Sequence, residues 1–331
     1  MAQTSSKLKL SLVVPVYNGQ ETIEECLHAL CRQTVGMDQY EVLVIDDGST
    51  DATPEIIARF PVRCVRLPAN RGRIVARLTG AREAACDELL FCDSRVICES
   101  DVVEKVLAHP YRPLMFGSDF PEEYQTTLYG LFTFSVYRKL WKPVFPQEWY
   151  GPEAPITPEN FDRMPKGTGV LAVSREFFLR HQPTHVDKFV SDDTLLLSSM
   201  VKEKPIVRYC GMKTHYRQRR ELKHVLPHLH FRGILFDSYY LRPGHWFLWL
   251  YLALWAVAAG VVVAAALTHH LWIIPAALAA IWIAASAALA INLRTFLAIL
   301  TLLPLIGCCF ATGILRGHLV SLRRWMKWKS E

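Results

Sequence analysis

The sequence has almost no charge over one long stretch. Between Trp246 and Leu315 the only Asp, Glu, Lys or Arg is Arg294, although the chain holds 37 Lys and Arg and 31 Asp and Glu. A stretch of this length with one charge is poorly solvated in water, which argues against a wholly soluble protein. The hydrophobic content of 51% excludes a disordered chain.

The nine cysteines include no C-x-x-C pair. Metal-binding and redox motifs usually need such spacing, so we expect reduced thiols packed in a core, without zinc or disulfides. The formal charge of +6 suits a protein lying against an anionic membrane leaflet. Nucleic acid is not expected as a partner, because the basic residues near the apolar region already have lipid as a partner there. Nothing in the sequence indicates an oligomeric state.

Three apolar runs follow one another near the end of the sequence. They are Trp246–Leu267, Leu271–Ile291 and Thr295–Leu315, of 22, 21 and 21 residues. About 20 apolar residues cross a bilayer core. We therefore predict two or three transmembrane helices in 246–315, with Pro304 and Gly307 leaving a re-entrant third segment open.

The segments around this region complete the predicted organisation. Residues 221–245 are expected to form an interfacial amphipathic segment and residues 316–331 a basic interfacial tail. The first twelve residues contain no long apolar stretch, so we expect the domain formed by residues 1–220 to stay cytoplasmic. The sequence thus predicts a multi-pass membrane protein, with a bacterial inner membrane as the expected location.

Strand and helix patterns alternate in the first third of the chain, which predicts an α/β domain with a mainly parallel sheet. The expected strands are Lys9–Val16, Tyr40–Ile45, Val62–Leu67 and Glu88–Cys92. The expected helices are Glu21–Arg32, Pro54–Phe60, Ile74–Cys86 and Asp101–Ala108. Ligands of such sheets bind beyond the carboxyl ends of the strands, where this sequence places Tyr17-Asn18, Asp46-Asp47 and Asp93.

These residues carry a resemblance that covers about residues 8–110. The segments are Val14-Pro15-Val16-Tyr17-Asn18, Val44-Ile45-Asp46-Asp47-Gly48-Ser49-Thr50-Asp51, Asn70-x-Gly72 and Ala76-Arg77-x-x-Gly80. Together they resemble the donor-binding half of a family 2 glycosyltransferase with the Rossmann-like GT-A fold. Further segments resemble the family more loosely, namely Gly167-Thr168-Gly169, Ser191-Asp192-Asp193 and Tyr216-Arg217-Gln218-Arg219-Arg220.

The resemblance implies a role for each of these groups. A UDP- or GDP-linked sugar donor would contact Pro15, Tyr17, Asn18, Asp46, Asp47, Arg77 and Asp93. Asp193, with Asp192 beside it, would be the general base that an inverting displacement requires. An acceptor or its phosphate would contact Gly167, Thr168, Gly169, Arg217, Arg219 and Arg220. Alternatively, Asp46 and Asp47 only form a turn, and the acids at 192–193 only begin a helix.

The expected metal site departs from the family pattern. The family usually has D-x-D here, a pair that holds Mg²⁺ or Mn²⁺ against the donor's diphosphate. This sequence has Asp93-Ser94-Arg95, so a guanidinium replaces the second carboxylate. Either Asp93 binds a divalent cation with help from elsewhere, or Arg95 takes over part of the neutralisation.

The interpretation that follows is a membrane-anchored inverting glycosyltransferase. It would transfer single sugars to a lipid-linked or membrane-proximal saccharide, because two or three spans are few for a translocation channel. A sugar-phosphate nucleotidyltransferase is disfavoured, since no basic glycine-rich loop follows the first strand. A degenerate scaffold is supported by Arg95, whereas Asp93, Asp192 and Asp193 argue against it.

Overall fold

The computed structural model describes residues 8–119, 125–142, 153–182, 192–219 and 221–330. Side chains are described for these residues except at 118–119, 192, 210, 212–213, 238 and 323–330. The chain forms two compact units. The first comprises residues 1–121, 141–188 and 192–218, and the second residues 122–140, 189–191 and 219–331.

The first unit is built on one mixed sheet. Its strands are β1 (Leu10–Val16), β2 (Tyr40–Asp46), β3 (Arg63–Arg66), β4 (Glu88–Cys92), β5 (Val96–Cys98), β6 (Leu114–Asp119), β7 (Ala154–Ile156), β8 (Val170–Ser174) and β9 (Ile206–Tyr216). Their order is β3-β2-β1-β4-β8-β6-β9-β5, with β7 paired to β9. Strands β1 to β4 are parallel, whereas β8 runs antiparallel to both β4 and β6.

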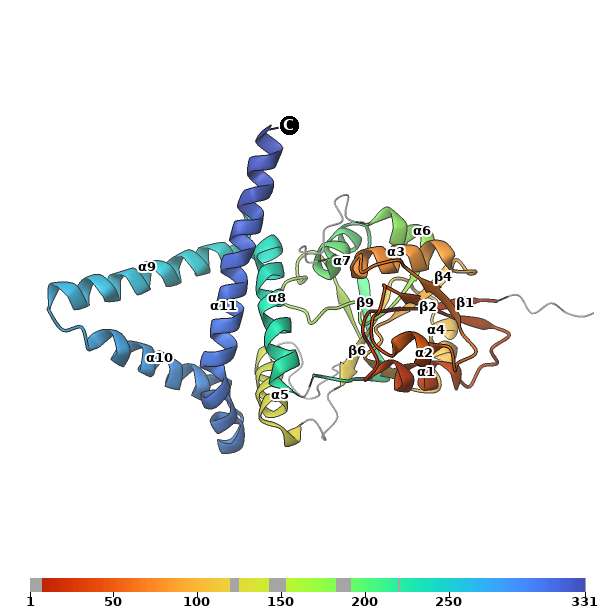
Figure 1. The fold of residues 1–331 in the computed structure, drawn as a ribbon, viewed down its shortest axis with the longest axis horizontal. Coiled ribbons are helices and arrows are strands. Elements are labelled where there is room, and N and C mark those ends of the chain that lie inside the picture. Colours follow the sequence, from red (N-terminus) through yellow and green to blue (C-terminus); the bar gives the residue numbers. More distant parts are fainter. Residues whose placement is uncertain (1–7, 120–124, 143–152, 183–191, 220, 331) are drawn as a thin grey trace, which may run out of the picture. The chain divides into compact units, whose positions relative to one another are not determined.

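Helices cover both faces of the parallel strands. They are α1 (Ile23–Cys31), α2 (Thr53–Ile57), α3 (Arg73–Glu83) and α4 (Val102–Ala108), followed by α6 (Arg175–Arg180) and α7 (Asp192–Glu203). Figure 1 shows α3 on one side of β1 and β2, with α1 and α2 on the other. The alternation of β1 explains this, because Leu12 and Val14 pack in the core that holds α1, while Val13 faces α3.

Glycine at position 80 allows α3 to lie very close to the sheet. A Cβ at Gly80 would come within 2.2 Å of Val13 Cγ1 on β1. Any larger residue would push the helix outward, since contacts this short do not occur in packed proteins. The close contact fixes α3 against β1, so that Arg77, almost one turn before Gly80, lies toward the carboxyl ends of the strands.

The expected α/β fold with a mostly parallel central sheet is confirmed. The four strands and four helices expected in 9–108 are all present, although α2 ends at Ile57 instead of Phe60. The strands from β5 onward were not expected from the sequence pattern, and they make the second half of the sheet largely antiparallel. Short strands such as β5 and β7, of three residues each, give too few positions for a periodic pattern.

The second unit is helical. It contains most of α5 (Leu128–Trp141), together with α8 (Leu222–Tyr240), α9 (Trp246–Leu267), α10 (Ile273–Leu289) and α11 (Leu293–Ser330). Phe132 of α5 packs with Ile299, Leu302 and Ile306 of α11. Ser135 Oγ of α5 also donates a 2.7 Å hydrogen bond to the carbonyl of Leu289. A segment far earlier in the sequence therefore joins the C-terminal helices, which a boundary near residue 220 does not foresee.

Glycines bring α8 and α11 into direct backbone contact. A Cβ at Gly313 would lie 2.1 Å from the carbonyl oxygen of His230, and one at Gly233 would lie 2.3 Å from that of Phe310. Small residues four apart allow apolar helices to approach in this way, and Gly317 continues the row. The segment expected to be an interfacial amphipathic helix is thus a helix packed along α11 (Figure 1).

Two helices are long and apolar enough to cross a membrane. They are α9, with 22 residues, and the part of α11 between Leu293 and Leu322, with 30. Only 6% of the most apolar window of α9 is buried within the protein, so α9 does not have the environment of a soluble core helix. The middle run forms α10, whose 17 residues are fewer than the roughly 20 that cross a bilayer core.

Candidate donor and acceptor site

The loops after β1 and β2 are tied together at the carboxyl end of the sheet. The amide of Asn18 donates to Ser49 Oγ at 2.9 Å, and the amide of Thr50 donates to Asn18 Oδ1 at 2.8 Å. Asn18 adopts a positive φ of 47°, which asparagine tolerates better than most residues. The neighbouring Tyr17 is 46% exposed, so its ring can take up a stacking partner.

Asp46 and Asp47 are buried and accept hydrogen bonds from the turns around them. Asp46 Oδ1 accepts from the amide of Ser49 at 2.9 Å. The two oxygens of Asp47 accept from the amides of Arg71 and Gly72, both at 2.8 Å. Burial raises the pKa of Asp47, and these two amide bonds oppose that rise. Asp46 therefore stabilises its own turn, whereas Asp47 holds the loop from which α3 begins.

Asp193 lies at the centre of a charged cluster. Its Oδ1 is 2.5 Å from Arg77 Nη1 and also accepts a 2.5 Å hydrogen bond from Thr168 Oγ1. Its Oδ2 is 3.6 Å from Arg73 Nη1. The fold thus brings together residues from α3, from the loop before β8 and from the start of α7, which the sequence analysis assigned to donor, acceptor and base separately.

Two opposing effects set the pKa of Asp193. Burial raises it, but the positive charge of Arg77, then that of Arg73 and the hydrogen bond from Thr168 lower it more. The net pKa of Asp193 is well below its usual range. With its carboxylate so stabilised, Asp193 is a weak proton acceptor in this arrangement.

Asp93 lies beside the same cluster, at the end of β4. Its amide donates to the carbonyl of Gly169 at 2.7 Å, and its Oδ1 accepts from the amide of Arg95 at 3.1 Å. Within the described ranges, no three His, Cys, Asp or Glu side chains gather as a metal site. Mg²⁺ in phosphate-transfer sites is held by one or two carboxylates plus substrate phosphates, so Asp93 fits a cation bound mainly by its substrate.

The proposed acceptor-side arginines have different environments. Arg217 Nε is 2.6 Å from Glu25 Oε2 on α1, and Nη1 of Arg95 donates to the carbonyl of Arg217 at 3.1 Å. Arg219 belongs to the second unit. Arg220 and the side chain of Asp192 lie outside the described residues. Of the three arginines, the structure therefore places only Arg217 in the first unit, next to Arg95.

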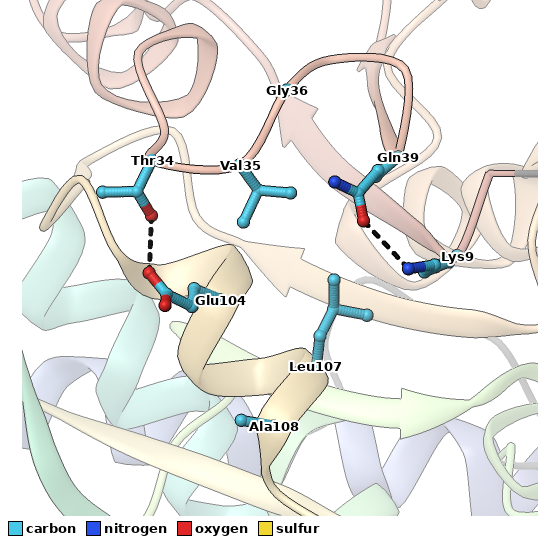
Figure 2. Close-up of a pocket in the computed structure, with 8 residues that line it drawn as sticks. All are labelled: Lys9, Thr34, Val35, Gly36, Gln39, Glu104, Leu107 and Ala108. Carbon is cyan, nitrogen blue, oxygen red and sulfur yellow. Dashed lines mark hydrogen bonds between the residues drawn. The ribbon is translucent and has the colours of Figure 1, made fainter. Parts of the chain in front are cut away.

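A surface hollow elsewhere in the first unit is separate from these residues. Figure 2 shows the residues that line it, among them Lys9 and Gln39, which directly precede β1 and β2, and Glu104 and Leu107 of α4. The hollow therefore lies at the amino ends of the strands, whereas Tyr17, Asp47 and Asp93 follow their carboxyl ends. Its polar groups are paired with each other, because Lys9 Nζ donates to Gln39 and Thr34 Oγ1 to Glu104, both at 2.9 Å.

Two residues next to groups of the site in space or in sequence were not expected from the sequence. Glu25, the partner of Arg217, is 192 residues away from it in the sequence, and no local pattern links them. Lys166 directly precedes the Gly167-Thr168-Gly169 segment, a position that could have marked it. Burial lowers the pKa of Lys166 to about 8, although Asp162 opposes this effect.

Comparisons with known proteins identify the class of domain. Residues 11–115 match the family model described as Glycosyl transferase family 2, so this part of the chain is a family 2 glycosyltransferase domain. Glycosyltransferase AglE of Haloferax volcanii is 38% identical over 95 residues, which are 27% of this chain and 31% of the relative. The expected family and enzyme class are thereby confirmed for this domain.

Solved structures extend the likeness beyond the matched segment. The mannosyltransferase PcManGT from Pyrobaculum calidifontis, in complex with GDP-Man and Mn²⁺, has a TM-score of 0.54 at 18% identity. The likeness covers 93% of this chain and 86% of that one. S. aureus TarS 1-349 in complex with UDP-GlcNAc has a TM-score of 0.50 at 17% identity, over 70% and 67% of the two chains. These likenesses confirm the GT-A fold.

The likeness to the curated relatives covers only part of this chain and less than a third of each of two relatives. The match to AglE spans 31% of that relative, and a match to a poly(ribitol-phosphate) beta-glucosyltransferase of Bacillus spizizenii spans 15% of its length at 42% identity. The residues matched by the family model include Tyr17, Asp47 and Asp93 but not Asp193.

Proposed function

We propose that this protein is a membrane-anchored, inverting glycosyltransferase. It moves a sugar from a UDP- or GDP-linked donor to a lipid-linked or membrane-proximal saccharide at the cytoplasmic face of a bacterial inner membrane. One observation carries the proposal: Asp193, Arg77 and Thr168 meet beside Asp93 at the carboxyl end of the sheet. This edge is where open α/β sheets bind their ligands.

The donor would lie along the loops that follow β1, β2 and β4. Tyr17, half exposed, would stack on the base, and the turn built by Pro15, Asn18, Asp46 and Asp47 would hold the nucleoside. Arg77 would bind the diphosphate, since a guanidinium fork can bond two phosphate oxygens at once. In support of such a donor, the structural neighbours bind UDP-GlcNAc and GDP-Man.

The transfer itself needs a base and a stabilised leaving group. The acceptor hydroxyl would give its proton to an Asp193 oxygen as its own oxygen bonds to the anomeric carbon. The bond from that carbon to the donor phosphate breaks, and the nucleoside diphosphate leaves with the electron pair. Attack from the face opposite the leaving group inverts the anomeric configuration. Positioned bases of this kind contribute about 10²–10⁴-fold to the rate.

A divalent cation would assist by neutralising the leaving diphosphate. PcManGT, which shares the fold, is bound to Mn²⁺. In this protein Asp93 is the residue that would hold Mg²⁺ or Mn²⁺, together with donor oxygens. Arg95 stands where the family has a second carboxylate, so part of the neutralisation would come from its guanidinium.

The acceptor would approach from the lipid side. Helices α9 and α11 would anchor the protein, with lipid covering the apolar surface that the protein leaves exposed. An acceptor carrying a phosphate would be bound through Gly167, Thr168 and Gly169 and through the cation Arg217 of the same unit. The basic residues of 316–331 would lie on anionic headgroups.

The full chain, purified in detergent, provides the test. It is supplied with UDP- and GDP-sugars, with and without Mn²⁺, and with a polyprenyl-diphosphate-linked saccharide as acceptor. We expect release of nucleoside diphosphate that disappears in Asp193→Asn and persists in Glu203→Gln, which changes an acid at the far end of the same helix. Pyrophosphate release would instead indicate a nucleotidyltransferase. Tight nucleotide binding without turnover would favour a degenerate scaffold.

A further inference from the structure

The proposed base and the proposed phosphate ligand are bonded to each other. Arg77 Nη1 lies 2.5 Å from Asp193 Oδ1, and Arg73 Nη1 lies 3.6 Å from Asp193 Oδ2. The Arg77 side chain is 5% exposed, whereas that of Asp193 is 27% exposed. Both oxygens of Asp193 thus face cations, and the buried arginine already has a carboxylate partner.

While they are paired, neither side chain can perform the role proposed for it, because each is bonded to the other. A general base must be within hydrogen-bond reach of the acceptor hydroxyl and ready to accept a proton. Asp193 instead faces Arg77 and Thr168, which stabilise its charge. A phosphate ligand must direct its N–H groups at the diphosphate, and Arg77 directs Nη1 at Asp193.

The donor's diphosphate has the chemistry to break this pair. It presents more negative charge and more acceptor oxygens than one carboxylate, and arginine favours such bidentate partners. Arg73 is 47% exposed, so it can turn toward an incoming phosphate. Thr168, 1% exposed, stays behind as the group that orients Asp193.

We infer that the donor's diphosphate competes with Asp193 for Arg77 and Arg73, so that donor binding releases the base. The inference rests on the proposed function, because it needs Asp193 as the base and Arg77 as a diphosphate ligand. It makes binding ordered: the donor binds first, and the acceptor then meets an active carboxylate. Thr168 is on this account a positioning residue.

The competition for the two arginines should change the affinity of the protein for nucleotide, which can be measured. If Asp193 occupies the arginines that the diphosphate needs, the negative charge of Asp193 weakens nucleotide binding. Removing that charge should then strengthen binding while abolishing transfer. Couplings between two ligands of one site are usually 5- to 150-fold, so we expect Asp193→Asn to bind UDP or GDP about tenfold more tightly than the unchanged protein.

The experiment measures UDP and GDP affinity of the full chain in detergent by calorimetry, with a chelator present so that no metal contributes. Glu203→Gln is the matched control, because Glu203 lies on the same helix and pairs with Arg180 at 3.0 Å. We expect its affinity to be unchanged. On an Arg77→Gln background, Asp193→Asn should have little effect. Asp193→Ser is the second variant should the first fail to fold, and melting curves check both.

Each result decides a different point. Tighter binding in Asp193→Asn that is absent from Glu203→Gln and from the Arg77→Gln background supports the competition. If the unchanged protein transfers sugar but Asp193→Asn binds nucleotide equally well or more weakly, the competition is overturned and the proposed function stands. Equal tightening in Glu203→Gln overturns it too, since the effect is then general charge. A protein that neither binds nucleotide nor transfers sugar refutes the proposed function and the inference together.

Discussion

Arg95 and Arg217 hold each other in place beside Asp93. Nη1 of Arg95 donates to the carbonyl of Arg217 at 3.1 Å, and the amide of Arg217 donates to the carbonyl of Arg95 at 2.8 Å. The backbone pairing of β5 with β9 supports both bonds, since Val96 pairs with Tyr216. A guanidinium is therefore fixed where the family pattern has the second carboxylate of D-x-D.

The first prediction concerns this exchange of charge. We expect Arg95→Asp to make transfer depend more strongly on Mn²⁺, because it restores a second carboxylate and removes a cation near the diphosphate. The ratio of activity with Mn²⁺ to activity with chelator should rise about tenfold or more, measured by nucleoside diphosphate release. Arg95→Gln separates loss of the cation from gain of the carboxylate. An unchanged ratio in Arg95→Asp would show that Arg95 does not replace a metal ligand.

The second prediction concerns Asp47 as the organiser of the loop before α3. Asp47→Ala leaves the part-buried amides of Arg71 and Gly72 without their acceptor, and each such loss costs about 0.5–1.5 kcal/mol. We expect a lower melting temperature and weaker nucleotide binding, because Arg73 and Arg77 follow in the same segment. Glu24→Ala is the control, since its ion pair with Arg59 is exposed and worth little. Full stability with lost nucleotide binding would instead favour direct base recognition.

The third prediction is a pH dependence of stability that comes from Lys166. Its Nζ donates to the carbonyl of Phe161 and lies 4.4 Å from the centre of that ring. Burial lowers its pKa to about 8, against about 10.4 in an unfolded chain. Between these values the unfolded state binds more protons, so the free energy of unfolding rises with pH, by up to about 3 kcal/mol. Below pH 8 the two states bind the same proton and the contribution is constant.

Paired variants check this rise. Denaturant unfolding of the unchanged chain and of Lys166→Met is compared between pH 7 and 10, with exposed Lys202→Met as the control. The stability difference between the unchanged chain and Lys166→Met should shift in favour of the unchanged chain as the pH increases. A difference that stays constant over this range would mean that Lys166 titrates normally.

The sequence predicted the donor half of the fold far better than the rest. Residues 8–110 alternate long strands and helices, and their turns carry specific residues such as Gly48, whose φ of +73° a side chain would strain. Strands β6, β8 and β9 depend on pairings between distant segments, antiparallel for β6 with β8 and parallel for β6 with β9, which periodicity does not reveal. The apolar C-terminal helices were visible from composition alone, but not the place of α5 among them.

The sequence predicted which residues belong to the candidate site better than it predicted which of them contact each other. Strand ends meet at one edge of a parallel sheet, so Tyr17, Asp47 and Asp93 were expected to lie together. The ion pair between Arg77 and Asp193 joins residues 116 positions apart, and it depends on the fold bringing the start of α7 next to α3. The proposal that the diphosphate competes with Asp193 for Arg77 therefore could not come from the sequence alone.

The last prediction tests the contact between α8 and α11. Gly313→Ala places a methyl group 2.1 Å from the carbonyl of His230 and 3.0 Å from Gly233 Cα, so the two helices must move apart. Overpacking of this kind costs about 1–3 kcal/mol, and we expect a clearly lower melting temperature in detergent. Gly307→Ala on the same helix is the matched control, because a Cβ there meets nothing within 4 Å. Its added helix propensity should leave stability unchanged or slightly higher, by up to about 1 kcal/mol. Equal melting temperatures for the two variants would show that α8 does not pack on α11 through these glycines.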